Sequence, residues 1–212
     1  MAGTFDAVHE HPAETFVSAA ASFAALVRKI PADSWAGPGL GEWDLRSLVG
    51  HTSRSLTTVT AYLEQPAEVE DVASPQEYYA MAKAYAARAG SEAIVRRGRD
   101  AAAELGDDPA AAIDALAAAA TAAVTGAEDR LITVIGGLGM RLYTYLPTRT
   151  FELAVHSLDI AAATGLPCEL PEEVLTEAIV LAARTAVHLG DGVPVLSALT
   201  GRTTLPQGFS VV

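Results

Sequence analysis

Two residues in the last third of the sequence have the types and the spacing of metal ligands. Glu152 and His156 are four residues apart within residues 147–165, and side chains four apart lie on one face of a helix. A carboxylate oxygen and an imidazole nitrogen can then converge on one ion. Pairs of this kind also occur as ordinary contacts on helix surfaces, so the spacing by itself leaves both interpretations open.

A third ligand has to come from another segment, and His51 is the best candidate. Catalytic metal sites commonly use three protein ligands and keep one position open. His51 lies beside the apolar stripe of a predicted helix, offset from the centre of the stripe by roughly 110° at 100° per residue. The helix therefore has to be rotated suitably to present it. The alternative is a histidine that is hydrogen-bonded at the flank of a helix. Asp159, three residues after His156, is a candidate for orienting an imidazole from outside the ligand set.

The elements that would position these residues are mainly helices. Apolar residues recur at helical spacing, with Asp44 and Ser74 as N-caps, and with prolines near the starts and glycines after the ends of segments. We expect residues 131–145, which include the glycines of 135–139, to be extended or irregular. The pattern predicts helices over residues 13–30, 45–65, 74 to beyond 94, 109–124, 147–165 and 171–190, and a short one over 193–200.

The fold class that follows is all-α, in one domain over residues 1–212. A chain of 212 residues with 50% hydrophobic residues can bury a full core, and we see no internal repeat or low-complexity linker. We expect a bundle over about residues 12–165, which carries the candidate ligands, and a C-terminal helical extension over about 166–212. The tail over residues 191–212 is expected to lie against the bundle as a strap.

Composition excludes several classes of function. A net charge of -12 and a pI near 4.7 argue against nucleic acid as a partner, because binding to phosphates needs clustered Lys and Arg. The first thirty residues carry Asp6, Glu10 and Glu14 and lack the basic start and apolar run of a secretory signal. The most apolar stretch, residues 109–124, contains Asp114 and is shorter than the roughly 20 residues that span a bilayer. We therefore expect a cytoplasmic protein without membrane contact.

Several other conspicuous residues have plain interpretations. Cys168 is the only cysteine, so it cannot form an internal disulfide. The glycines of 135–139 lack a following Lys and are interpreted as a turn, not a phosphate cradle. The histidines outside the triad, His9, His11 and His188, are not expected to be ligands. Three tyrosines, Tyr78, Tyr79 and Tyr85, are expected to pack in the core or at its rim.

A family resemblance joins the two candidate segments. Residues 41–51, GEWDLRSLVGH, carry the W-x-x-x-x-L-x-x-H pattern, and residues 149–160, RTFELAVHSLDI, carry R-x-x-E-x-x-x-H-x-x-D. Together and in this order they resemble the motifs of the mycothiol-dependent maleylpyruvate isomerase family, over about the first 165 residues. The resemblance implies a DinB-like four-helix bundle. In that family the matching residues bind a divalent metal, usually zinc, and here they are His51, Glu152 and His156.

The resemblance also implies mycothiol as a thiol cosubstrate and a transfer or isomerisation reaction. The isomerase has a separate sterol-carrier-like domain after the bundle, whereas this sequence has residues 166–212, so we expect an electrophile other than maleylpyruvate. Arg149 or Arg46, near the ligands in sequence, is a candidate for binding a substrate carboxylate, the alternative being a solvated surface arginine. Two rival functions stay open, a metal-dependent hydrolase and a non-catalytic module stabilised by its metal. A homodimer also stays open.

Overall fold

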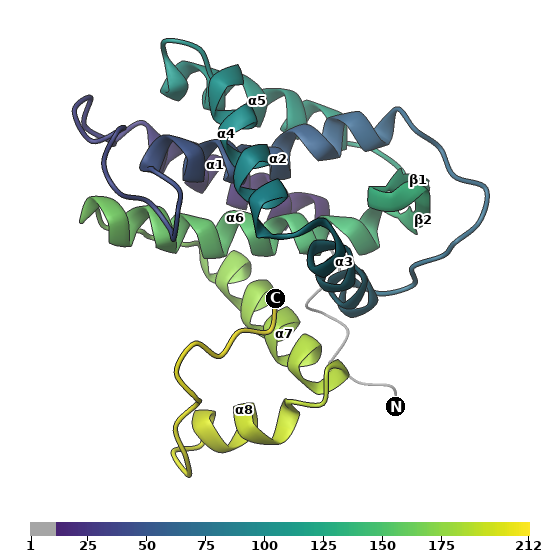
Figure 1. Cartoon of the computed structure of the whole chain (residues 1–212). Coiled ribbons are helices and arrows are strands. Elements are labelled where there is room, and N and C mark those ends of the chain that lie inside the picture. The colour runs from purple at the N-terminus through teal and green to yellow at the C-terminus, as the bar shows by residue number, and fades with distance from the viewer. Residues whose placement is uncertain (1–11) are drawn as a thin grey trace.

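The computed structural model describes residues 12–212, so Asp6, His9, Glu10 and His11 lie outside the described part. Within it the chain forms eight helices and one small antiparallel sheet (Figure 1). The helices are α1 (Pro12–Val27), α2 (Leu45–Leu63), α3 (Pro75–Ala89), α4 (Ser91–Glu104), α5 (Pro109–Val124), α6 (Leu142–Thr164), α7 (Glu172–His188) and α8 (Gly192–Leu199). The strands are β1 (Leu131–Val134) and β2 (Leu138–Arg141).

Four helices form the bundle. Helix α6 packs against α1 and α2, and α5 packs against the same two helices from the other side, so that α1, α6, α2 and α5 close a ring around the core. Figure 1 shows these four helices running side by side. Their facing sides are apolar and fully buried, for example at Phe23, Leu48, Ile113 and Leu153. The prediction of an all-α, DinB-like four-helix bundle is confirmed.

Local sequence signals explain where several helices begin. The carboxylate of Asp44 accepts a hydrogen bond from the backbone N–H of Ser47, and Asp108 does the same for Ala111. Each cap satisfies an N–H group that has no partner inside the helix. The predicted starts of α2 and α5 are therefore confirmed.

The prediction that Pro147 opens a helix is wrong, because α6 begins at Leu142. The first N–H groups of α6 are satisfied from a distant segment: Leu142 N–H donates to the carbonyl of Arg130, and Tyr143 N–H donates to the carboxylate of Asp129. A cap supplied from so far away leaves no local signal in the sequence. Pro147 lies inside the helix and removes one backbone hydrogen bond there.

The helix predicted to run from residue 74 to beyond 94 is in fact two helices. Gly90 separates α3 from α4 with a φ of 80°, a backbone region that glycine enters without a steric penalty. Residues 131–141 form β1 and β2, joined by a single 3₁₀ turn at Ile135–Gly137. This segment, which was expected to be extended or irregular, is therefore a regular hairpin.

The remaining helices lie outside the ring. Helix α4 crosses α2 at very short range, because a Cβ atom added to Gly50 would lie 2.4 Å from the backbone nitrogen of Ala102. Helix α7 packs on α6 and α3, and α8 packs on α7. After α8, residues 201–208 are exposed, and the chain then returns so that Val212 lines a cavity beside α3. Within residues 12–212, no helix has the length and apolarity needed to cross a bilayer.

Candidate metal centre

The fold brings His51, Glu152 and His156 together. His51 is on α2 and the other two are on α6, and each of the three offers a ligand atom within 4.8 Å of the others. The two helices run antiparallel, because His51 lies against His156 while Thr58, farther along α2, bonds to Tyr145 near the start of α6. The offset of His51 from the apolar stripe is therefore not an obstacle, because its position at the edge of the stripe faces α6.

The ring of His51 is held between two aromatic neighbours. Its centroid is 4.4 Å from that of Trp43 and 5.1 Å from that of His156. Trp43 is itself fixed, since its indole N–H donates to the carbonyl of Val95 at 3.1 Å. The Nδ1 atom of His51 is buried and has no hydrogen-bond partner, which is unusual for a buried polar atom. A nitrogen in this condition suits a metal ligand.

Glu152 and His156 are oriented by neighbours on their outer sides. The Nδ1 atom of His156 lies 2.9 Å from the carboxylate of Asp159, and its Nε2 atom lies 3.3 Å from Oε2 of Glu152. The hydroxyl of Tyr79 donates to Oε1 of Glu152 at 2.9 Å. Asp159 and Tyr79 thus hold the outer atoms of the two side chains and leave Nε2 and Oε2 facing each other, an arrangement typical of metal ligands and their supporting shell.

The protonation states differ among the three candidate ligands. Burial, together with the charge of His156, lowers the pKa of His51 to about 4, so this imidazole is neutral. Burial alone would raise the pKa of Glu152, but the hydrogen bond with His156 and the charge of Arg149 lower it to about 2. Burial would lower the pKa of His156, but the hydrogen bonds with Asp159 and Glu152 raise it to about 9. Two nitrogens and one carboxylate oxygen form a donor set that fits zinc.

The two arginines singled out in the sequence lie in different places. Arg46 points away from the triad: its guanidinium donates to the carbonyls of Ala102 and Gly106 at the end of α4, and it does not line the cavity described below. Arg149 lies in that cavity with 9% of its surface exposed. Its Cζ atom is 5.2 Å and 4.9 Å from the ring centroids of Tyr78 and Tyr145, and its Nε donates to the hydroxyl of Thr148.

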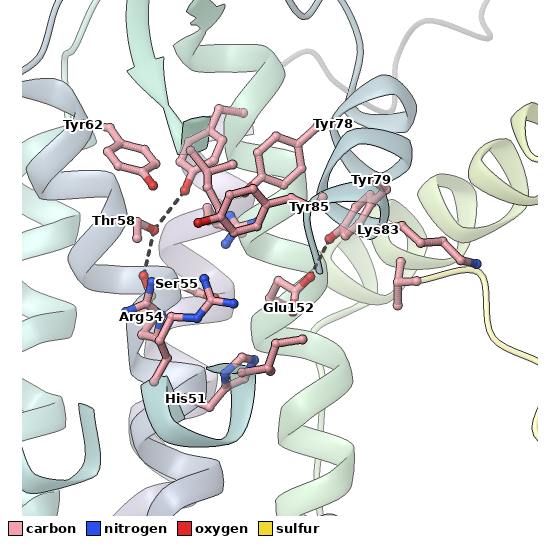
Figure 2. Close-up of a pocket in the computed structure, with 17 residues that line it drawn as sticks. His51, Arg54, Ser55, Thr58, Tyr62, Tyr78, Tyr79, Lys83, Tyr85 and Glu152 are labelled. Atoms are coloured by element: carbon pink, nitrogen blue, oxygen red, sulfur yellow. Dashed lines mark hydrogen bonds between the residues drawn. The ribbon is translucent and has the colours of Figure 1, made fainter. Parts of the chain in front are cut away.

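A cavity of about 300 Å³ opens beside the triad and includes His51 and Glu152 in its wall (Figure 2). Its lining has four basic side chains, Arg54, Lys83, Arg97 and Arg149, against one acidic side chain, Glu152. Within residues 12–212, no acidic side chain forms an ion pair with any of these four. The cavity is therefore electropositive in a protein whose net charge is -12.

Tyrosines form much of the remaining wall, which the sequence interpretation missed. Tyr78 and Tyr79 pack in the core as predicted, but they also line the cavity together with Tyr62, Tyr85 and Tyr145. Figure 2 shows Tyr79 reaching toward Glu152 and the rings of Tyr62, Tyr78 and Tyr85 gathered on one side of Arg54. The spacing of residues 78, 79, 82 and 85 on one face of α3 was the available signal, but it is equally typical of a core face.

The fold and the site define a helical-bundle protein with a candidate three-ligand metal centre beside a cationic, tyrosine-lined cavity. Comparison with known families gives the closer assignment. The family model described as mycothiol maleylpyruvate isomerase N-terminal domain matches residues 16–161. The chain belongs to this family, which is one of mycothiol-associated, metal-binding enzymes. Searches of curated proteins and of solved structures found no match.

Proposed function

We propose that this protein is a zinc-dependent enzyme that binds mycothiol and either transfers it to a small electrophile or uses it to isomerise that electrophile. His51, Glu152 and His156 are the zinc ligands in this proposal. One observation carries it: three ligand atoms of suitable type lie within 4.8 Å of one another, and two of the three residues, His51 and Glu152, line a cavity with room for a small molecule. Membership in the family supports the choice of thiol.

When bound, a zinc ion with one open position favours the thiolate form of a thiol through its charge. The protein needs no nucleophile of its own, and its single cysteine, Cys168, is not part of the cavity wall. In a transfer by addition, the thiol sulfur bonds to a substrate carbon and the thiol hydrogen ends on the neighbouring carbon. In an isomerisation the sulfur–carbon bond breaks again after rotation, and the thiol is regenerated.

The residues around the ligands prepare them for the ion. Asp159 accepts a hydrogen bond from the Nδ1–H group of His156 and so keeps Nε2 available as the ligand atom. Tyr79 donates to one oxygen of Glu152 and leaves the other for the ion. Burial, together with the negative charge of Glu152, raises the pKa of Tyr79, so its hydroxyl stays protonated and remains a donor.

Two arginines are placed to bind an anionic group on either substrate. Arg54 is three residues after His51 on α2, and Arg149 is three residues before Glu152 on α6. Because the helices are antiparallel, both arginines are displaced in the same direction from the ligands, by roughly 4.5 Å at 1.5 Å per residue. Guanidinium groups bind carboxylates through paired hydrogen bonds. Arg149 is the stronger candidate because its cationic group is buried among tyrosines and forms no ion pair with a carboxylate of residues 12–212.

The test combines metal content with thiol turnover. Elemental analysis of the purified protein should give about one ion per chain. The zinc-loaded protein should also conjugate mycothiol to monochlorobimane faster than the metal-free protein does, in a substitution that releases chloride and the thiol proton. One ion with ester hydrolysis but no use of thiol would instead support the hydrolase, and one ion with neither activity would support the metal-stabilised module. No bound ion after loading with zinc would overturn the proposal.

A further inference from the structure

Exposed apolar side chains surround the junction of α7 and α8. Four large hydrophobic residues there are between 63% and 76% exposed. They are Val187, Val193, Leu196 and Leu199, and all four line one hollow. We call this set the α7–α8 patch. Contiguous apolar surfaces of a few hundred Å² on soluble proteins mark sites of interaction.

Helix α8 has the composition of a buried helix but not its surroundings. Its sequence is GVPVLSAL, with no charged residue, and none of its residues is buried. A helix of eight residues has little stability of its own and depends on packing, yet α8 packs mainly on α7. Figure 1 shows it at the far end of α7, away from the ring of α1, α2, α5 and α6. Among residues 12–212, one side of α8 therefore has no apolar neighbour.

A shallow hollow of about 460 Å³ lies between α7 and α8 and offers a place for such a neighbour. Val187 on α7 and Val193, Leu196 and Leu199 on α8 form its sides. Every residue in its lining is apolar or glycine, so the hollow has no side-chain group for recognising a polar or charged ligand. Its chemistry fits aliphatic side chains.

We propose that the occupant is a second copy of this chain, docked through the same α7–α8 patch about a two-fold axis. In such a contact each patch meets an identical patch, and an uncharged apolar surface is complementary to itself. The ten residues from Gly192 to Gly201 include no charged residue. Because the chain carries a net charge of -12, an uncharged face is where two copies approach with the least repulsion.

The size of the patch agrees with this occupant. A fully exposed aliphatic side chain presents roughly 60–120 Å² of apolar surface, so the four side chains of the patch, each at least 63% exposed, present roughly 170–340 Å². Two copies together would bury roughly 340–670 Å², which is less than the apolar share of a standard interface of roughly 1,600 Å² and fits a weak association. The expected dimer is reversible and concentration-dependent, and it does not depend on the metal or on the proposed reaction.

Sedimentation velocity of the full chain, from about 1 to 300 µM, tests the proposal. The wild type should shift with concentration from 21.9 kDa toward twice that mass. Leu196→Glu should weaken dimerisation at least about tenfold, since it places a charge in the interface. Leu40→Glu, at a residue 41% exposed in the loop before α2, is the matched control and should leave dimerisation unchanged. Circular dichroism of both variants should show an unchanged helical fold.

A cross-link identifies the face directly. In a Cys168→Ser background, Leu199→Cys should form a disulfide between two copies under mild oxidation, whereas Leu40→Cys should not. A monomer at every concentration would overturn the proposal, and so would a dimer that Leu196→Glu leaves intact, because that dimer would use another face.

Discussion

The indole ring of Trp43 lies against the imidazole of His51, with centroids 4.4 Å apart and an angle of 31° between the ring planes. Trp43 precedes α2 and His51 lies inside it, so the contact joins the entry of the helix to the candidate ligand. The indole N–H is bonded to Val95 on α4, and Gly98 on α4 leaves room for the ring, since a Cβ atom there would lie 2.7 Å from the indole nitrogen. The tryptophan therefore limits the rotation of His51.

Trp43 should report on metal binding. The chain has two tryptophans, Trp35 and Trp43, and only Trp43 contacts a candidate ligand. Titration of zinc into the metal-free protein should change the tryptophan fluorescence until about one equivalent is bound. Trp35→Phe should keep this change, and Trp43→Phe should abolish most of it. A change that survives in Trp43→Phe would place the ion elsewhere.

Removal of a single ligand should remove most of the bound metal. His156→Ala and His51→Ala each leave two protein ligands, and a zinc site with fewer than three is weak. Elemental analysis after dialysis should give far less than one ion per chain for both variants, with the helical circular dichroism largely kept. His188→Ala, at an exposed position at the end of α7, is the control and should keep the wild-type content. Full metal content in His156→Ala would contradict the assignment of the ligands.

Local sequence patterns predict part of the site and part of the fold. The spacing of Glu152 and His156 and the caps at Asp44 and Asp108 are local patterns, and the structure has these residues in the expected helices. The cap of α6 comes from Asp129, across the hairpin, so no local pattern could reveal where that helix begins.

The cavity was also beyond the reach of local patterns. It is formed where α2, α3 and α6 meet, and a tyrosine on an apolar helix face looks the same in sequence whether it faces a core or a cavity. Arg46 and Arg149 illustrate the same limit. Both lie near the candidate ligands in sequence, yet one bonds to the end of α4 and the other lies in the cavity.

Metal binding should be coupled to the release of about one proton at pH 7. In the metal-free protein His156 is protonated at this pH because its pKa is raised to about 9. His51, with a pKa of about 4, is already neutral, and Glu152, with a pKa of about 2, is already ionised. Only His156 must lose a proton, so the apparent zinc affinity should rise about tenfold per pH unit up to about pH 9 and then level off.

Calorimetric titration in buffers with different ionisation enthalpies measures this proton directly. Release of no proton or of two protons at pH 7 would show that the charge states of the metal-free site are different from those inferred here.

Replacing Asp159 should weaken the site without dismantling it. Asp159→Asn keeps the size of the side chain but removes the charge that faces Nδ1 of His156. Loss of such a supporting group typically lowers metal affinity 10- to 100-fold, so competition with a chelator should show a dissociation constant raised by about that factor. Less than one proton should be released at pH 7, because the pKa of His156 falls. Asp33→Asn, at an exposed loop residue, is the control, and equal affinities for the two variants would remove Asp159 from the supporting role.

Gly50, which precedes the candidate ligand His51, should not tolerate a larger side chain, for steric reasons. A Cβ atom at this position would lie 2.4 Å and 2.6 Å from the backbone nitrogen and Cα of Ala102, so Gly50→Ala forces α4 away from α2. Overpacking of this kind costs about 1–3 kcal/mol, which denaturant unfolding at constant pH should detect. Adding Ala102→Gly should not restore stability, because the conflict is with backbone atoms that this second change leaves in place. Rescue by Ala102→Gly would mean that the Cβ atom of Ala102, and not its backbone, limits the approach of α4 to α2. The close packing of Gly50 on Ala102 would then not be what keeps α4 in place to hold Trp43 against His51.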